Sequence, residues 1–136
     1  MLRTFKLGPK DLERISAAPN EPHHHAFEEL IIGVAGTLEH FIDYRSESID
    51  APFVSFVTKG KVHRVRPAAK DGRCDMTVIR FRSEFIPETI FQLYSLFHDQ
   101  AQLQMSDGRC FTRMTTVADM IAEEMARPEP DLAVVR

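Results

Sequence analysis

The stretch Glu21-Pro-His-His-His-Ala-Phe-Glu-Glu-Leu-Ile-Ile-Gly-Val-Ala-Gly36 decides the fold of this chain, because a histidine-rich start leads directly into an apolar run that stops at glycines. In an extended strand, side chains an even number of residues apart point to the same face. A strand here would therefore place His23, His25 and Glu29 on one face. His24 would point to the opposite, exposed face.

Short β-like runs follow this stretch at regular intervals. Residues 37–43 alternate loosely between apolar and polar side chains, and a loop containing glycine separates them from the apolar run before them, which is a hairpin signal. Short strands with turn residues between them indicate an antiparallel sandwich or barrel, which we place at 21–85. Residues 1–20 form either an N-terminal arm or an edge strand. Further runs with β patterning cover 52–57, 62–66 and 76–81.

The last third of the chain, residues 86–136, has helical patterning. Residues 87–97 carry apolar side chains at helical spacing behind a proline, which is tolerated in the first turn of a helix. A second helix is expected from about 107 to 126, with Ser106 as its N-cap. The apolar stripe of this helix consists of Cys110, Met114, Val117, Ile121 and Met125.

The last ten residues of the chain combine two prolines with the start of a further helix. Pro128 and Pro130 are expected to end the second helix, and Asp131 then has the position of an N-cap for a third one. Only one turn of that third helix precedes the last residue, Arg136. Because a single turn does not offset its nucleation cost, we expect a domain edge that is interrupted at this point.

Length, charge and cysteine content exclude several classes of protein. The 136 residues fit one domain, and 17 basic against 20 acidic residues are not typical of a domain that binds nucleic acid. The basic residues between 59 and 66, and those at Arg80 and Arg82, are interpreted as solvated strand faces. Without a bilayer-spanning apolar run or a signal peptide, we expect a cytoplasmic protein that does not bind membranes. Cys74 and Cys110 form no CxxC pair and are expected to be reduced thiols.

One set of residues has the chemistry of a metal site. His63 comes from a different predicted strand than the first histidines and the glutamate. Convergence inside a barrel would bring together three imidazoles and one carboxylate, from His23, His25, Glu29 and His63. Such donors suit Zn, Ni, Mn or Fe. The residues alone leave open whether a divalent metal is bound or whether the four side chains only line the barrel.

The spacing of these residues resembles that of the cupin superfamily. The pattern His-x-His-x-x-x-Glu at 23–29, followed by Gly36, resembles the first cupin motif. Pro52 and the later His63 resemble the second motif. The resemblance covers about residues 20–82 and implies a mainly β protein, with a small antiparallel barrel of the jelly-roll type followed by C-terminal helices.

A narrower resemblance spans nearly the whole chain. The stretch 21–36 looks like the opening of the N-terminal sensor domain of AraC-family transcription regulators, and segments at 41–43, 59–63 and 79–85 match other parts of that domain. The resemblance implies a barrel that binds a small-molecule effector and helices that form a homodimer. It also implies that 86–136 is a dimerisation segment truncated before a helix-turn-helix domain, so that this chain would contact DNA only through that absent domain.

Two further sets of residues have both a functional and a structural interpretation. An effector pocket could be lined by aromatic side chains, which could equally fill the core: Phe41, Phe53, Phe56 and Phe81. A dimer interface could use the apolar side chains of the second helix, which could equally pack on the barrel: Met114, Val117, Ile121 and Met125. In the switching hypothesis, an effector favours one arrangement of the barrel, the arm 1–20 as a lid, and the helices.

Two other functions remain open at this point. A stand-alone metal-dependent cupin enzyme, a dioxygenase or an isomerase, is the alternative, because metals in such sites keep positions open for substrate. The third possibility is a cupin that binds a sugar or an acid without a regulatory partner. The sequence has no clear nucleophile or acid–base pair and no phosphate-binding glycine loop, so we assign no catalytic residue and do not expect an enzyme.

Overall fold

A computed structural model of the chain describes residues 2–12, 26–42, 44–58, 60–85, 102–106 and 108–136. The strands are β1 (Leu2–Leu7), β2 (Glu28–Ala35), β3 (Thr37–Ile42), β4 (Arg45–Asp50), β5 (Phe53–Val57), β6 (His63–Ala68), β7 (Asp75–Phe81) and β8 (Gln102–Gln104). A 3₁₀ turn (Ser83–Phe85) follows β7, and the C-terminal helices are α3 (Arg109–Met125) and α4 (Leu132–Val135). Residues 9–12, after β1, are also helical. The predicted hairpin corresponds to β2 and β3, the strands on either side of Gly36. The predicted runs 52–57, 62–66 and 76–81 correspond to β5, β6 and β7.

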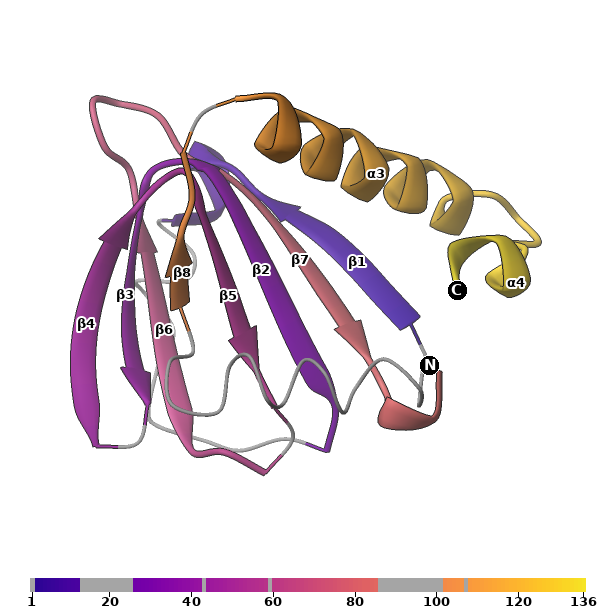
Figure 1. Cartoon of the computed structure of the whole chain (residues 1–136), viewed down its shortest axis with the longest axis horizontal. Helices are drawn as coiled ribbons and strands as arrows, with labels where there is room; N and C mark the ends of the chain where they lie inside the picture. The colour runs from indigo at the N-terminus through magenta and orange to yellow at the C-terminus, as the bar shows by residue number, and fades with distance from the viewer. Residues whose placement is uncertain (1, 13–25, 43, 59, 86–101, 107) are drawn as a thin grey trace.

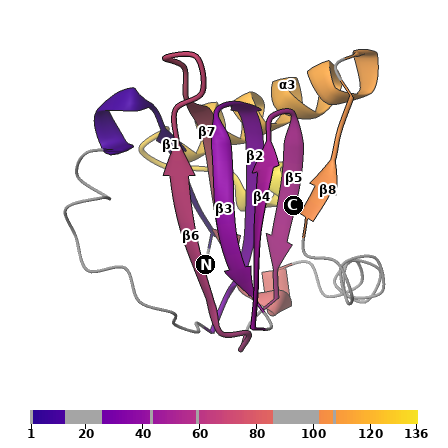
Figure 2. The ribbon, with the colours of Figure 1, turned by 90° about the vertical axis from the view of Figure 1, so that its left-hand side faces the viewer.

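Two antiparallel sheets face each other, and helix α3 lies across the outer face of the larger one (Figure 1). The larger sheet has the order β1-β7-β2-β5-β8, and the smaller one has the order β4-β3-β6. Figure 2 shows the smaller sheet in front of the larger one. A mainly β fold followed by helices, as predicted, is confirmed.

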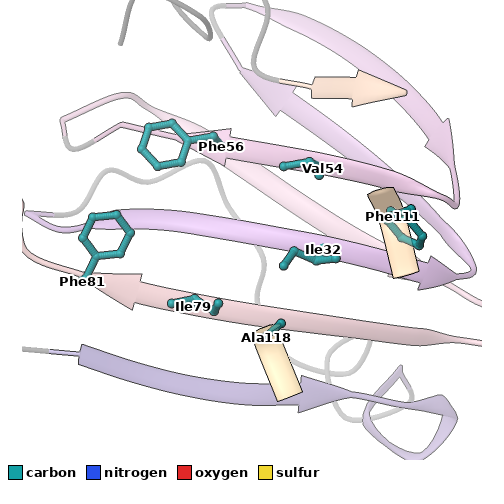
Figure 3. Packing of buried hydrophobic residues seen from close by; sticks show 7 residues of the cluster. All are labelled: Ile32, Val54, Phe56, Ile79, Phe81, Phe111 and Ala118. Atoms are coloured by element: carbon teal, nitrogen blue, oxygen red, sulfur yellow. The ribbon is translucent and has the colours of Figure 1, made fainter. Parts of the chain in front are cut away.

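The larger sheet is buried on both faces. Its inner face packs against the smaller sheet in a cluster formed by Leu7, Ile31, Leu38, Phe53, Cys74, Met76 and Val78. Its outer face packs beneath α3 in a second cluster, which Figure 3 shows as Ile32, Val54, Phe56, Ile79, Phe81, Phe111 and Ala118. All five residues of β5 are buried as a result, so this strand is a nearly continuous apolar run and not an alternating one.

Two strands were not assigned by sequence alone, and a third was one of two alternatives. Strand β4 is polar, because five of its six residues are exposed at the edge of the smaller sheet, and only Ile49 is partly buried. Strand β8 has three residues and pairs with β5, although its segment was expected to be helical. Strand β1 pairs with β7 over six residues, and its Leu7 is buried. Of the two interpretations of the N-terminal residues, 2–7 thus form the edge strand.

Helix α3 begins later than expected and buries a slightly different face. Its N-cap is Gly108 and not Ser106, and no side chain caps it. The packed face contains Phe111 and Ala118, whereas Val117 is 54% exposed. The predicted stripe therefore lies about one residue away from the buried one, because the sequence pattern did not use Phe111. The predicted helix at 87–97 lies outside the described residues.

A polar contact joins the two C-terminal helices. The side chain of Asp131 accepts hydrogen bonds from the backbone N–H groups of Ala133 and Val134, so the predicted N-cap is confirmed. Glu124 Oε1 accepts from the Asp131 backbone N–H at 2.8 Å and from Arg127 Nη1 at 2.7 Å, and these contacts lower the pKa of Glu124. Among the described residues, no helix is long and apolar enough to cross a membrane.

Close packing inside the sandwich predicts a large effect for a small change at Gly33. Gly33 lies opposite Phe53 in the pairing of β2 with β5, and a Cβ atom added at Gly33 would overlap the Phe53 ring. We expect Gly33→Ala to lower the free energy of unfolding by about 2–3 kcal/mol, which is typical of overpacking in a close-packed core. Chemical denaturation measures this loss.

Two further variants check that prediction. Gly108→Ala is the matched control, because a Cβ there meets no atom within 4 Å, and it should change stability little. Gly33→Ala combined with Phe53→Leu should recover part of the loss, since the smaller side chain relieves the overlap. An unchanged unfolding midpoint for Gly33→Ala would contradict the packing described above.

Candidate functional site

A line of buried polar side chains runs between the two sheets. Ser55 Oγ lies 3.2 Å from His40 Nδ1, and His40 Nε2 lies 3.3 Å from His63 Nδ1. His63 Nε2 is in turn 3.7 Å from Glu29 Oε2. Arg80 Nε donates a 2.8 Å hydrogen bond to Glu29 Oε1. Five side chains from five strands thus form one continuous series of polar contacts. Two other polar residues, Glu28 and Thr77, are also buried, and neither belongs to this series.

Strand alternation brings these residues together. Glu29 and Arg80 are direct partners in the pairing of β2 with β7, so their side chains lie on the same inner face. His40 shares the inner face of β3 with the buried Leu38, two residues before it. His63 begins β6, and its ring meets that of His40 edge to face, with centroids 5.5 Å apart.

Burial determines the charge of His40. The side chain is fully buried, and desolvation lowers the pKa of His40 from 6.5 to about 4, although the nearby Glu29 carboxylate partly opposes this shift. His40 is therefore neutral at pH 7, with one ring nitrogen that donates and one that accepts. If Ser55 Oγ donates to His40 Nδ1, then His40 Nε2 donates to His63 Nδ1; the opposite order reverses both bonds. The tautomer of one ring therefore fixes whether the other ring donates or accepts the hydrogen bond that they share.

Arg80 is the part of the series that solvent reaches. Its side chain is 32% exposed, whereas the Glu29 side chain is 3% exposed. The Arg80 Cζ atom lies 5.0 Å from the ring centre of Phe5 and 5.1 Å from that of Phe27. Phe5 belongs to β1 and Phe27 directly precedes β2, the two strands on either side of β7. The guanidinium group is thus held by a carboxylate and by cation–π contacts with two rings.

The structure brings two of the four predicted metal ligands together. Glu29 and His63 face each other across 3.7 Å, from strands in different sheets. His23 and His25 lie outside the described residues, as does His24. Within the described part of the chain, no group of three or more His, Cys, Asp or Glu side chains could hold a metal ion. The carboxylate and the imidazole fit a metal in chemistry, and they account for half of the predicted donors.

The four predicted pocket residues do not come together. Phe53 is in the inner cluster, between the sheets. Phe56 and Phe81 belong to the outer cluster, on the other face of the larger sheet, and Figure 3 shows them toward the opposite end of the strands from Phe111 and Ala118 of α3. Phe41 is half-buried on the smaller sheet, where Arg64 Cζ lies 5.6 Å from its ring centre. These side chains lie in three separate places, so they do not line one common pocket in this structure.

The predicted dimer residues divide between two environments. Met114 and Ile121 pack against the outer cluster of the larger sheet, as the structural interpretation expected. Val117 is exposed, and with Ile121 it borders an open groove of about 410 Å³ between α3 and α4. Met125 is half-buried and borders a second hollow, of about 450 Å³, beside β1.

Sequence reasoning did not identify three members of the polar series. Arg80 was interpreted as part of a solvated strand face, but its Nε is bound to Glu29. A signal was present for the other two. His40 has an even spacing from Leu38 in an alternating strand, and Ser55 is the single polar residue among the five of β5. A lone polar side chain on a buried face needs a partner, which these two residues are for each other.

Solved structures of known proteins share this arrangement of strands and helices. No protein-family profile matches the chain, and no curated protein matches it. The AraC-like transcriptional activator CuxR matches 98% of the chain over 44% of its own length, with a TM-score of 0.57 and 10% identity. ToxT from Vibrio cholerae O395, bound to (E)-4-(8-methylnaphthalen-1-yl)but-3-enoic acid, matches 99% of the chain over 51% of its own length, with a TM-score of 0.54 and 7% identity.

The chain shares its fold with the AraC-like transcriptional activator CuxR over 98% of its length. Cupin proteins also match, among them a cupin 2 domain-containing protein from Halorhodospira halophila, which covers 58% of the chain and 49% of its own length with a TM-score of 0.42 and 15% identity. The chain spans about half the length of these three proteins. At these identities the likeness shows the fold alone, and it rests on the two matches with the higher TM-scores, CuxR and ToxT.

The buried imidazole predicts a pH dependence of stability. Above pH 6.5 His40 is neutral in both the folded and the unfolded chain, so it contributes no slope. As the pH falls from 6.5 toward 4, the unfolded His40 takes up a proton that the folded one excludes, and stability is lost. With a chelator present, this one group should lower the free energy of unfolding by up to about 3 kcal/mol in total.

A variant isolates this contribution. His40→Gln removes the titrating group and keeps an amide that can bond to Ser55 and His63. Urea unfolding at a series of pH values should show a flatter pH dependence for His40→Gln than for the wild type, between pH 4 and pH 6.5. The same slope for both proteins would mean that His40 is not protected from protonation in the folded state.

Proposed function

We propose that this chain is the effector-sensing and dimerising part of an AraC-like transcription regulator. The observation that supports the proposal is the extent of the two regulator matches, which take in 98% and 99% of the chain and so include the helices after the barrel. The mildly acidic composition agrees with a chain that does not itself bind DNA. In this proposal the DNA contacts come from a separate domain of the full-length protein.

The effector would enter the sandwich at the end where the polar series reaches solvent. At that end β7 finishes at Phe81, and β2 begins with Glu28 directly opposite. ToxT was solved with an aromatic carboxylic acid bound, which supports a small organic effector for this chain as well. Strand β1 is the edge next to β7, so a displacement of β7 at the site would reach the N-terminal strand and α3, which contacts β1.

Dimerisation would use the exposed side of the helical pair. Val117 is 54%, Met120 61% and Val134 72% exposed, and these three side chains border the groove between α3 and α4. Methionine adapts its shape to a partner surface, which suits such a contact. The buried side of α3, with Met114 and Ile121, would then hold the helix on the barrel, and the dimer contact would lie on the side of Val117.

The full-length gene product tests this proposal. We expect it to bind DNA as a dimer and to carry a DNA-binding domain in addition to this cupin-type domain. Val117→Lys combined with Met120→Lys should place charges in the apolar contact, give a monomer in sedimentation, and weaken DNA binding at least about 10-fold, because a charge buried without a partner is costly. Gel-shift titration measures the DNA affinity.

Thr112→Lys is the matched control for that pair of substitutions. Thr112 is exposed on the same helix and does not border the groove, so its substitution should leave both the dimer and the affinity unchanged. A gene product that has no DNA-binding domain would contradict the regulator proposal. It would leave the enzyme and the plain binding module as the remaining functions.

We further propose that His63 and Glu29, with His23 and His25, hold a divalent metal ion. The 3.7 Å approach of His63 Nε2 to Glu29 Oε2 in the barrel interior supports this, since imidazole and carboxylate are metal ligands. A metal would supply Lewis-acid chemistry or orient a ligand. In such a site His40 would orient His63 by a hydrogen bond to His63 Nδ1, which leaves His63 Nε2 for the metal. Arg80 would orient Glu29 by its hydrogen bond to Glu29 Oε1.

Elemental analysis of the purified protein tests the metal proposal. We expect nearly stoichiometric Zn, Ni, Mn or Fe in the wild type, and its loss in His63→Ala and Glu29→Gln. His24→Ala is the control, because the sequence pattern places His24 on the other strand face. No metal in the wild type after reconstitution would contradict the proposal. Stoichiometric metal would also justify testing the alternative function, a stand-alone cupin dioxygenase or isomerase.

A further inference from the structure

The Arg80 guanidinium has hydrogen-bonding capacity that the fold does not use. An arginine side chain carries five N–H donors. Its Nε donates to Glu29, and among the described residues the structure gives its two terminal nitrogens no hydrogen bond. The side chain is also 32% exposed, at the end of a series whose other members are buried. Among the described residues, Arg80 therefore keeps donors that are not hydrogen-bonded, on the one side chain of the series that is partly exposed to solvent.

This group is held in place before any ligand arrives. Glu29 binds its Nε, and the rings of Phe5 and Phe27 lie within about 5 Å of its Cζ. Glu29 is itself in contact with His63, which is bonded through His40 to Ser55. Binding to a side chain whose rotamers are already restricted costs less conformational entropy than binding to a free surface arginine.

We propose that Arg80 binds a carboxylate group of the effector through its two terminal nitrogens, with the apolar body of the effector against Phe5 and Phe27. This inference rests on the proposed sensing function and names the chemical class of the effector. The planar fork of a guanidinium matches the two oxygens of a carboxylate, and such charge-assisted pairs are the stronger hydrogen bonds in proteins. The two rings supply the apolar surface that a hydrophobic acid would cover.

The local charge favours a carboxylate over a phosphate. Arg80 has two direct cross-strand partners, Glu29 in β2 and Arg3 in β1. Because directly paired side chains share a sheet face, one carboxylate lies beside two guanidinium groups, and the site has a surplus of about one positive charge. A ligand with one negative charge adds one charge beside Glu29, whereas a phosphate dianion would add up to two and meet stronger repulsion. The site is thus suited to a hydrophobic monocarboxylic acid.

Nuclear magnetic resonance of the ¹⁵N-labelled chain tests the proposal. The probes are benzoate, 4-phenylbutyrate and octanoate, each compared with its neutral amide, and inorganic phosphate. We expect at least one carboxylate to shift the Arg80 Nε–H resonance in a saturable manner, and its amide to bind at least about 10-fold more weakly, because the amide forms no charge-assisted pair. Phosphate should also bind more weakly than that carboxylate.

Two arginine-to-lysine variants distinguish the effect of the guanidinium geometry on carboxylate binding from the effect of its positive charge. Arg80→Lys keeps a cation beside Glu29 but loses the planar fork, and it should weaken carboxylate binding about 10-fold. Arg64→Lys is the matched control, because Arg64 also lies over a phenylalanine ring, that of Phe41, but in the smaller sheet. Its substitution should leave the affinity unchanged. If Arg80→Lys does not fold, the comparison of acid with amide on the wild-type chain decides the question.

Three results would overturn this inference. They are no shift of the Arg80 resonance with any of the three acids, equal binding of acids and amides, and phosphate binding as tightly as the best acid. None of them would affect the regulator proposal, which depends on DNA binding by the full-length protein. Conversely, carboxylate binding at Arg80 with no DNA-binding domain in the gene product would leave the site in place and remove the regulator.

Discussion

The ion pair between Arg80 and Glu29 is the constraint on which the rest of the site depends. A buried carboxylate without a counter-ion costs several kcal/mol, so a strand that carries Glu29 inward needs a cation beside it. The pairing of β2 with β7 places Arg80 directly opposite. With that charge balanced, His63, His40 and Ser55 extend the polar series into the sandwich, and each has a hydrogen-bonding partner.

The second constraint is the burial of both faces of the larger sheet. Helix α3 covers the outer face, so the inner face is available for a polar site without the sheet losing its apolar packing. One apolar cluster lies between the sheets and the other on the outer face of the larger sheet. Near the candidate site, the partly exposed side chain is that of Arg80, close to the end of β7. This division explains why aromatic content alone did not locate a pocket. It also accounts for the difference in burial along α3, where Val117 is exposed and Phe111 and Ala118 are buried.

Much of the fold was predictable because local pattern and tertiary structure agree in most strands. The hairpin at 37–43 and the runs at 52–57, 62–66 and 76–81 were found from alternation and turns. The missed β4 and β8 are edge strands, whose polar or short sequences carry no burial signal. In α3 the buried face differs from the predicted apolar stripe, because Phe111 and Ala118 pack against the larger sheet. The position of that sheet relative to the helix is set by tertiary structure and not by the helix sequence.

The sequence by itself determined the class of fold, and the spacing of Glu29 and His63 predicted that these two side chains lie close together, as the structure places them. Period and spacing are local properties, and a single chain records them in its residue order. Tertiary structure alone decided that Arg80 is the partner of Glu29, and that His40 and Ser55 extend the site. Those contacts join residues distant in sequence across strand pairs and across two sheets. Strand register and the packing of the two sheets determine such contacts, and the sequence of a single segment does not specify either of them.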